Sequence, residues 1–180
     1  MKGIVFTEFS EMVESQFGDD MMDTIIEQSE LPSGGIYTAV GTYDHTEILQ
    51  LVTTLSSVTN IEVPKLVFAF GQHLYTYFYS HYPDFFSTET TVFEFLQSVE
   101  EHIHVEVRKL YPDAELPRFD CRTIGDNQFE MIYRSTRPFA DVAEGLISSC
   151  VQHYNESISI HRENVEDEHG PGVRFLLTKA

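Results

Sequence analysis

His104 is the first candidate for chemistry, because it lies in a stretch, Val92 to Tyr111, whose apolar residues recur at steps of three and four. That spacing predicts one face of an α-helix. At about 100° per residue, His104 falls within roughly 20° of Phe93 and Tyr111, at the edge of the apolar face. A histidine there needs a partner for each ring nitrogen, which a carbonyl, a hydroxyl or a metal ion can supply. Taken alone, the helix favours a structural histidine.

The second candidate is the motif Tyr133-Arg134-Ser135-Thr136-Arg137. If an extended strand continues past Tyr133, side chains two residues apart share a face and lie about 7 Å apart. Tyr133, Ser135 and Arg137 then point the same way and form a receptor for carboxylate or phosphate oxygens, which arginine binds bidentately. The alternative is a polar strand edge whose arginines pair with surface acids.

The hydrophobic pattern that positions these residues divides the chain into two parts. Helical spacing predicts helices over residues 4–17, 21–28, 45–59, 63–82, 91–110 and 141–154. Asp44 and Glu47 form an expected capping pair, and residues 36–42 are ambiguous between a short helix and an extended segment. After Pro117 the period changes from 3.6 to 2.

This second period predicts a β-hairpin over residues 119–133 and two more strands near residues 158–160 and 173–177, with a turn at 166–172 between them. We therefore expect an α+β fold. It consists of an N-terminal helical lobe and a C-terminal lobe with a four-stranded antiparallel sheet and helices. The length predicts a single domain over residues 1–180.

The net charge of −18 argues against binding to nucleic acid or to an anionic membrane surface, because phosphates are repelled. The 42% of hydrophobic residues are enough for a substantial core. Cys121 and Cys150 make neither a disulfide framework nor a zinc motif. The sequence shows no signal peptide and no apolar run long enough to span a bilayer, so we expect a cytoplasmic protein.

Together the two candidates suit a haem group. His104 can ligate the iron, while Tyr133, Ser135 and Arg137 can bind the two propionates. A cation near the propionates offsets the cost of drawing ionised carboxylates towards an apolar site.

Further short motifs extend this pattern along the whole chain. They are Met1-Lys2-Gly3, Ala69-Phe70-Gly71, residues 78–83, Leu110-Tyr111-Pro112, Pro117 and Glu144-Gly145-Leu146. With these residues in this order, the chain resembles the haem–nitric oxide/oxygen binding (H-NOX) family, whose fold holds haem between two lobes. The likeness is to the stand-alone gamma-proteobacterial type, which is related to the haem domain of soluble guanylate cyclase.

The resemblance implies a role for each residue around a bound haem b (iron protoporphyrin IX). His104, and not His102, is the proximal iron ligand, and Pro117 presses on the porphyrin and helps to bend it. The Tyr-x-Ser-x-Arg motif binds the propionates. The distal or haem-contacting positions all carry apolar side chains, namely Val5, Phe9, Phe78, Val142 and Leu146.

Val142 stands at the position where oxygen-binding members of the family place a tyrosine that donates a hydrogen bond to dioxygen. Bound dioxygen carries partial negative charge and needs such a donor, whereas nitric oxide needs little help. An apolar distal side is therefore expected to favour nitric oxide, and also carbon monoxide, over stable dioxygen binding. Some relatives hold zinc in the C-terminal region, but Phe139 and Asp141 replace the expected cysteines, so we expect no zinc.

The expected function is thus a haem-based nitric oxide sensor. Nitric oxide binds ferrous haem on His104, the iron–His104 bond breaks, and the shape change regulates a partner, which the family suggests is a histidine kinase or a diguanylate cyclase or phosphodiesterase. We expect a monomer and no enzymatic activity, since no nucleophile–base pair is evident. Two alternatives remain open: a haem enzyme, such as a peroxidase or nitric oxide dioxygenase, and an interaction module without a cofactor.

Overall fold

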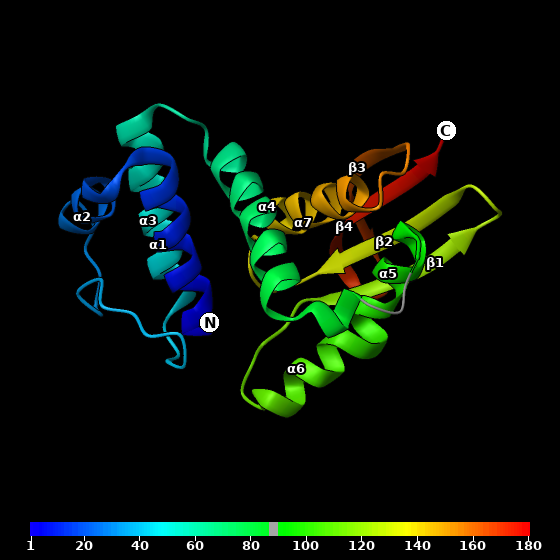
Figure 1. Cartoon of the computed structure of the whole chain (residues 1–180), viewed down its shortest axis with the longest axis horizontal. Helices are drawn as coiled ribbons and strands as arrows, with labels where there is room; N and C mark the ends of the chain where they lie inside the picture. Colours follow the sequence, from blue (N-terminus) through cyan, green and yellow to red (C-terminus); the bar gives the residue numbers. More distant parts are fainter. Residues whose placement is uncertain (87–89) are drawn as a thin grey trace.

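The computed structural model, which describes residues 1–86 and 90–180, places a helical lobe beside a lobe built on a sheet (Figure 1). Three helices form most of the N-terminal lobe: α1 (Gly3–Phe17), α2 (Asp19–Glu27) and α3 (His45–Thr59). The long helix α4 (Val63–His81) packs against α1 and α3 at its start and runs on to the second lobe. It is therefore the element shared by both lobes.

Local signals in the sequence explain the ends of α3 and α4. The Asp44 side chain accepts a hydrogen bond from the backbone N–H of Thr46 (2.9 Å) and so caps α3. Glu47 does not complete the expected capping pair, because its carboxylate accepts hydrogen bonds from Ser33 and Tyr37 instead. The ambiguous segment 36–42 forms neither a helix nor a named strand and pairs only through an isolated bridge at Thr42.

The helix expected over residues 91–110 is present from Val92 to Leu110, but its middle is π-helical where a continuous α-helix was expected. A turn of 3₁₀-helix, Pro83–Phe86, leads towards α5 (Val92–Ser98), and α6 (His104–Leu110) follows only after a π-helical stretch, Val99–Ile103. A π turn takes up one more residue than an α turn, so the faces of the helix shift beyond it. Apolar spacing alone does not reveal such a shift, because both flanking segments remain helical.

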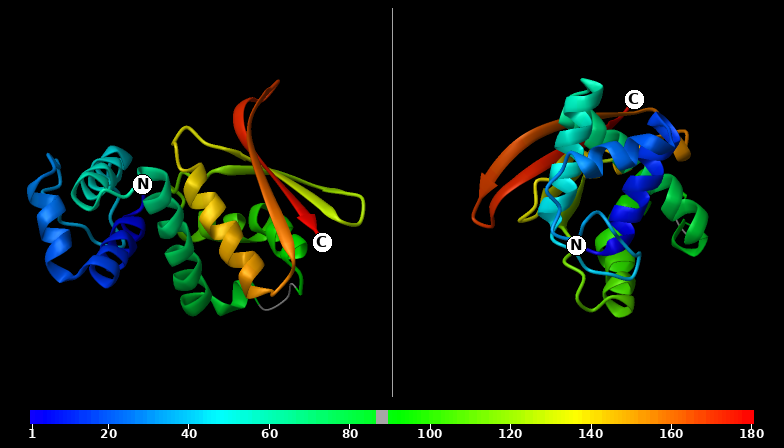
Figure 2. Two further views of the ribbon diagram at one scale, coloured as in Figure 1. Left: turned by 90° about the horizontal axis from the view of Figure 1, so that it is seen from above. Right: turned by 90° about the vertical axis from the view of Figure 1, so that its left-hand side faces the viewer.

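The sheet has the order β1-β2-β4-β3, and every neighbouring pair is antiparallel. Its strands are β1 (Arg118–Ile124), β2 (Gln128–Arg134), β3 (Ile158–Asp167) and β4 (Gly170–Lys179). Strands β3 and β4 meet at Glu168 and His169, so the predicted turn over 166–172 was too long. Helix α7 (Ala140–His153) connects β2 to β3 and lies beside α4 (Figure 2). The predicted α+β architecture with a four-stranded antiparallel sheet is confirmed.

Two glycines allow α4 and α7 to approach closely. A Cβ atom on Gly145 of α7 would lie 2.1 Å from the carbonyl oxygen of Phe68, and one on Gly71 of α4 would lie 2.3 Å from that of Val142. Neither position has room for a larger residue, because backbone atoms cannot move away as a flexible side chain can. This contact fixes Val142 and Leu146 relative to α4.

The buried side chains form two clusters, one in each lobe. The first lies among α1 to α4 and contains Phe6, Phe9 and Met12, while the second lies between the sheet and the helices α4, α5 and α7 and contains Phe129 and Phe175. Leu146 packs against both clusters. Among the described helices, none is both long and apolar enough to cross a bilayer.

Candidate functional site

His104 is the first residue of α6 and is buried, with 9% of its surface exposed. Its Nδ1 lies 2.9 Å from Oε2 of Glu100, one turn earlier, and its ring lies 5.7 Å from the ring of Phe119. Burial lowers the pKa of His104, and the hydrogen bond to Glu100 opposes this shift only in part. The ring is therefore neutral at neutral pH, and its Nε2 makes no hydrogen bond to any residue that the structure describes.

Glu100 is a residue that the sequence reasoning missed. Its Oε2 also accepts a hydrogen bond from the backbone N–H of Phe119 (3.3 Å), and its Oε1 accepts one from Arg108 (3.1 Å). The carboxylate thus joins the start of α6 to the start of β1. The four-residue spacing between Glu100 and His104 is the signal that could have revealed this pair, since such side chains are neighbours on a helix.

The Tyr133 motif is brought together by a turn and not by a strand. β2 ends at Arg134, so the expectation that Tyr133, Ser135 and Arg137 share one face of an extended strand is wrong. Instead the chain bends, and the Tyr133 hydroxyl donates to the carbonyl oxygen of Arg137 (3.2 Å). The backbone N–H of Arg137 donates to Oγ of Ser135 (3.1 Å). The three residues are neighbours, as the motif requires, but through a compact bend.

The two arginines of this motif have different surroundings. Arg134 is held by Asp120, Asp167 and the carbonyl oxygen of Gly170, which makes it a structural link within the sheet. The guanidinium of Arg137 is nearly buried and pairs with Glu115, whose side chain is 75% exposed. Arg137 therefore already makes the guanidinium–carboxylate contact expected of it, with a carboxylate from a solvent-facing segment.

The segment between α6 and β1 joins His104 to the Tyr133 motif. Phe119 lies between them, with its ring 5.7 Å from the ring of His104 and 5.7 Å from that of Tyr133. Pro117 is half-buried two residues before Phe119. A hollow of about 60 Å³ on the same side of the molecule is lined by Arg137 together with Met1, Lys2, Thr42, Asp113, Ala114 and Glu115. The residue expected on the proximal side, His104, and the residues expected to bind the propionates thus lie in one connected region.

The five expected distal residues belong to the first apolar cluster. Phe9 is fully buried and meets the ring of Phe70 edge-on at 5.4 Å. The other four are half-buried and pack against the same cluster: Val5, Phe78, Val142 and Leu146. Val142 lies in the first turn of α7. The structure thus separates an apolar set, in the first cluster, from the polar set around His104.

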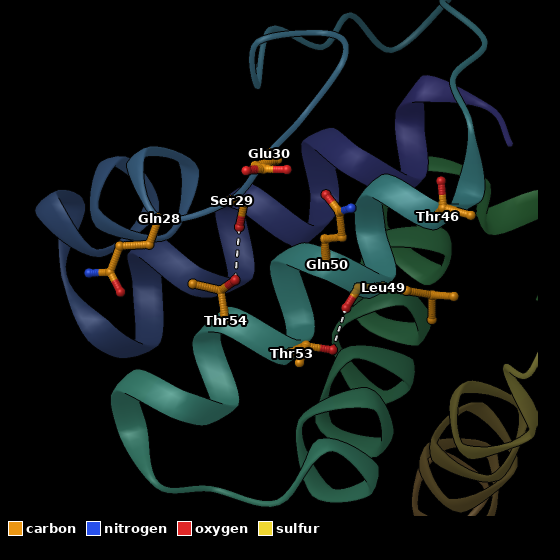
Figure 3. Close-up of a pocket in the computed structure, with 8 residues that line it drawn as sticks. All are labelled: Gln28, Ser29, Glu30, Thr46, Leu49, Gln50, Thr53 and Thr54. Carbon is orange, nitrogen blue, oxygen red and sulfur yellow. Dashed lines mark hydrogen bonds between the residues drawn. The ribbon is translucent and has the colours of Figure 1, made fainter.

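A surface hollow on the outer side of the helical lobe contains none of the predicted site residues (Figure 3). It lies over α2 and α3, and hydroxyls and amides make up most of its lining. Two of these hydroxyls are already engaged, because Ser29 bonds to Thr54 (2.8 Å) and Thr53 donates to the carbonyl oxygen of Leu49 (2.7 Å). Its lining contains no histidine, cysteine, methionine or tyrosine, the side chains that commonly ligate haem iron.

The positions discussed for zinc carry other contacts. Asp141 pairs with Arg162 (2.5 Å), and Cys150 is buried in the second apolar cluster. Burial raises the pKa of the Cys121 thiol to about 12, so it is not a ready metal ligand. Among the described residues, one group of three or more His, Cys, Asp or Glu residues has all its ligand atoms within 4.8 Å of one another; it consists of Glu8, Glu11 and His73, in the helical lobe.

The family model for haem-NO-binding proteins matches residues 2–162. The chain belongs to this family. The match spans α1 to α7 and enters β3, so it contains both the His104 region and the apolar distal set. H-NOX proteins are haem-binding gas sensors, and the family assignment applies that coarse description to this chain. No curated protein matches the chain.

Solved H-NOX structures share the fold along the full length. The ferrous unliganded H-NOX protein from K. algicida is 43% identical, with a TM-score of 0.91, and the match covers 100% of this chain and 97% of that one. The IWP-051-bound, Fe(II)CO H-NOX from Shewanella woodyi is also 43% identical (TM-score 0.84; 100% and 95% covered). The Fe(II)NO H-NOX from S. oneidensis is 26% identical (TM-score 0.90; 100% and 99% covered).

The donor set around His104 fits a haem group. A neutral, buried imidazole with its Nε2 unengaged by described residues is suited to ferrous iron. The guanidinium of Arg137 and the hydroxyls of Tyr133 and Ser135 suit carboxylates, as the contact with Glu115 shows for Arg137. The apolar side chains of the distal set suit the porphyrin faces.

Proposed function

We propose that this H-NOX chain is a nitric oxide sensor that uses haem b and controls a separate signalling protein. The proposal rests on a contrast between two regions. In one region the imidazole of His104 is hydrogen-bonded, while in the other the distal set is wholly apolar. Similar structures hold ferrous iron with nitric oxide in one case and carbon monoxide in another. These relatives support a gas as the ligand.

Different residues are proposed to bind different parts of the haem group. His104 would ligate iron through Nε2, and Arg137, Tyr133 and Ser135 would hold the propionates, with a propionate taking the place of Glu115 at Arg137. Pro117 contacts the porphyrin from the proximal side. Haem held by these residues would supply the ferrous iron to which the gas binds.

The apolar distal set selects among gases because it lacks polar groups. Val5, Phe9, Phe78, Val142 and Leu146 provide no hydrogen-bond donor, so they cannot stabilise the charge that develops on bound dioxygen. They also offer no histidine or arginine to cleave an O–O bond, which disfavours a peroxidase. We infer that the chain itself is not an enzyme.

The signal starts at His104 and passes through the contacts of α6. The first turn of α6, which carries His104, is tied to β1 through Glu100, so a change in how His104 is held would be passed to β1. The segment after α6 is in turn tied to the helical lobe, because Nζ of Lys2 lies 2.7 Å from Asp113. The two lobes can therefore change their arrangement together when the way in which His104 is held changes.

The chain has one domain in this proposal, and its output comes from a partner. We propose a histidine kinase or a diguanylate cyclase or phosphodiesterase as that partner, with the sensor acting as a cytoplasmic monomer. The net charge of −18 disfavours nucleic acid and anionic membranes as alternatives. A partner assay with and without nitric oxide tests this part, and unchanged partner activity contradicts it.

Absorption spectra test the gas-binding part. We expect the ferrous protein to show a Soret band that is unchanged by brief exposure to air, apart from slow oxidation, and that shifts when nitric oxide is added. His104→Gly should lose the band of the His-ligated form, and added imidazole should restore it. The matched control is His102→Gly, since His102 is exposed two residues away and should behave like the unaltered protein. A stable dioxygen spectrum, or no haem uptake, contradicts the proposal.

A further inference from the structure

The carboxylate of Glu100 is held on three sides. Its Oε2 lies 2.9 Å from Nδ1 of His104 and 3.3 Å from the backbone nitrogen of Phe119, while its Oε1 lies 3.1 Å from Nη2 of Arg108. The side chain is 26% exposed, so the pair is only partly screened by water. Glu100 lies on the π-helical stretch, and its partners come from α6 and β1, so they fix both the position and the direction of the carboxylate.

A carboxylate in this position determines which nitrogen of His104 carries the proton. An ionised carboxylate only accepts hydrogen bonds, so the proton resides on Nδ1 and Nε2 presents its lone pair. The same contact fixes the rotation of the ring, because Nδ1 must continue to face Glu100. His104 is thus oriented as a ligand by a neighbour on its own helix, before any metal is bound.

The contact also changes how strongly His104 donates electrons. A charged acceptor on Nδ1–H gives the imidazole more of the character of an imidazolate and raises its basicity towards a metal. Arg108 acts in the opposite sense, since its guanidinium draws negative charge towards the other oxygen of Glu100. The side chain of Arg108 is 46% exposed, so it moderates the effect without cancelling it.

We propose that Glu100 is a positioning residue that sets the strength of the bond between His104 and the haem iron, and that Arg108 moderates it. The inference rests on the proposed role of His104 as the iron ligand and goes beyond it. A stronger bond resists release when nitric oxide binds, so the pair Glu100–Arg108 sets how readily the sensor switches. The charge on Glu100 thereby adjusts how readily His104 is released, a property that the distal side does not control.

Resonance Raman spectroscopy of the ferrous protein tests the proposal, because it reports the vibration between iron and His104 directly. Glu100→Gln should lower its frequency, raise the midpoint potential and speed the release of His104 by nitric oxide by about tenfold, at the low end of effects seen for such partners. Arg108→Met should raise the frequency and slow the release. A merely structural role for Glu100 does not predict opposite shifts from these two variants.

The matched control is Glu101→Gln, which removes the same charge one residue away. Glu101 is exposed and bonds to Gln97, with no contact to His104. If Glu100→Gln moves the vibration no further than this control, the proposal is overturned. If Glu100→Gln does not retain haem, Arg108→Met decides, and an unmoved vibration overturns the proposal. A vibration that persists in His104→Gly shows instead that the iron ligand itself is misassigned.

Discussion

The proximal and distal regions of this H-NOX chain are built by opposite means. Around His104, polar groups are connected by hydrogen bonds that involve Glu100, Arg108 and the backbone of Phe119. The distal set belongs to an apolar cluster in the other lobe, with Leu146 in contact with both clusters. In the function proposed here, the first region controls the iron–His104 bond through charge, while the second controls gas selectivity through its lack of hydrogen-bond donors.

This difference separates two properties of a sensor. A change on the distal side alters which gas binds stably, because it alters what the gas can contact. A change on the proximal side alters how firmly His104 is held and how the signal leaves the site. Three substitutions outside this proximal network test the comparison. The largest effect is expected at Arg137, which is proposed to bind a haem propionate.

Arg137→Met should weaken haem binding by about 10- to 100-fold. The substitution removes a charge-assisted hydrogen bond, which contributes about 1.5–3 kcal/mol, and tenfold in affinity corresponds to about 1.4 kcal/mol. The haem affinity of Arg137→Lys should lie between that of the unaltered protein and that of Arg137→Met, since lysine keeps the charge but not the bidentate geometry. The rate of haem transfer to an excess of a haem-scavenging protein measures the effect.

Arg118→Met is the control for this experiment. Arg118 is 66% exposed and pairs with Asp120 on the surface, so its loss should leave haem transfer unchanged. Equal haem loss from both variants would show that total positive charge, and not the position of Arg137, holds the propionates.

Val142→Tyr should convert the distal side into one that retains dioxygen. A hydroxyl aimed at the bound gas adds a hydrogen bond of about 1–1.5 kcal/mol, which lengthens the lifetime of the dioxygen complex by about tenfold. Stopped-flow measurement of dioxygen dissociation gives the lifetime. The vibration between iron and His104 in the unliganded protein should remain unchanged, because the substitution lies in the distal region.

Val142→Phe is the control for Val142→Tyr, because it adds the aromatic ring without the hydroxyl. Both variants add a ring to a half-buried position in the first turn of α7, so both disturb packing to a similar extent. If the phenylalanine variant retains dioxygen equally well, ring size and not hydrogen bonding governs selectivity, and the distal half of the comparison is wrong.

The sequence predicted the architecture well because local patterns specify it. The change of period after Pro117 marked the start of the sheet, and Asp44 marked the start of α3. The π-helical stretch before His104 was not foreseen, since apolar spacing is nearly the same on both sides of one extra residue. The bend at Ser135 was also missed, although serine favours turns and its hydroxyl here accepts a hydrogen bond from the backbone N–H of Arg137.

The residues of the site were predicted more completely than their contacts. His104 and Arg137 could be chosen from their types and spacing, and the four-residue step to His104 could have revealed Glu100. Glu115 could not be chosen among the chain's 29 acidic residues. The Glu115 contact depends on how the segment between α6 and β1 folds back against the bend after β2, which no local pattern encodes. Their roles around haem stay predictions until the experiments above are done.

Glu8 is a buried acidic residue beside the apolar distal set, and its substitution is expected to have the smallest effect. It lies on α1 beside Phe9, is 4% exposed and contacts Nε2 of His73 at 3.1 Å. Burial raises the pKa of Glu8, and the hydrogen bond to His73 opposes this shift only in part. The folded state therefore favours the protonated carboxyl, so this group contributes stability below its ordinary pKa of 4.5 and loses it as the pH rises through the raised value.

Glu8→Gln imitates the protonated carboxyl at every pH. It should raise the melting temperature at pH 7.5 by about 2–4 °C, which corresponds to about 1 kcal/mol in a chain of this size, and should change nothing below pH 4.5. Glu14→Gln removes the same charge from an exposed position on α1, away from Glu8, and should have little effect at either pH. A lower melting temperature for Glu8→Gln at pH 7.5 would show that the ion pair with His73 outweighs the cost of burial. The helical lobe would then depend on a charge pair, as the proximal region does.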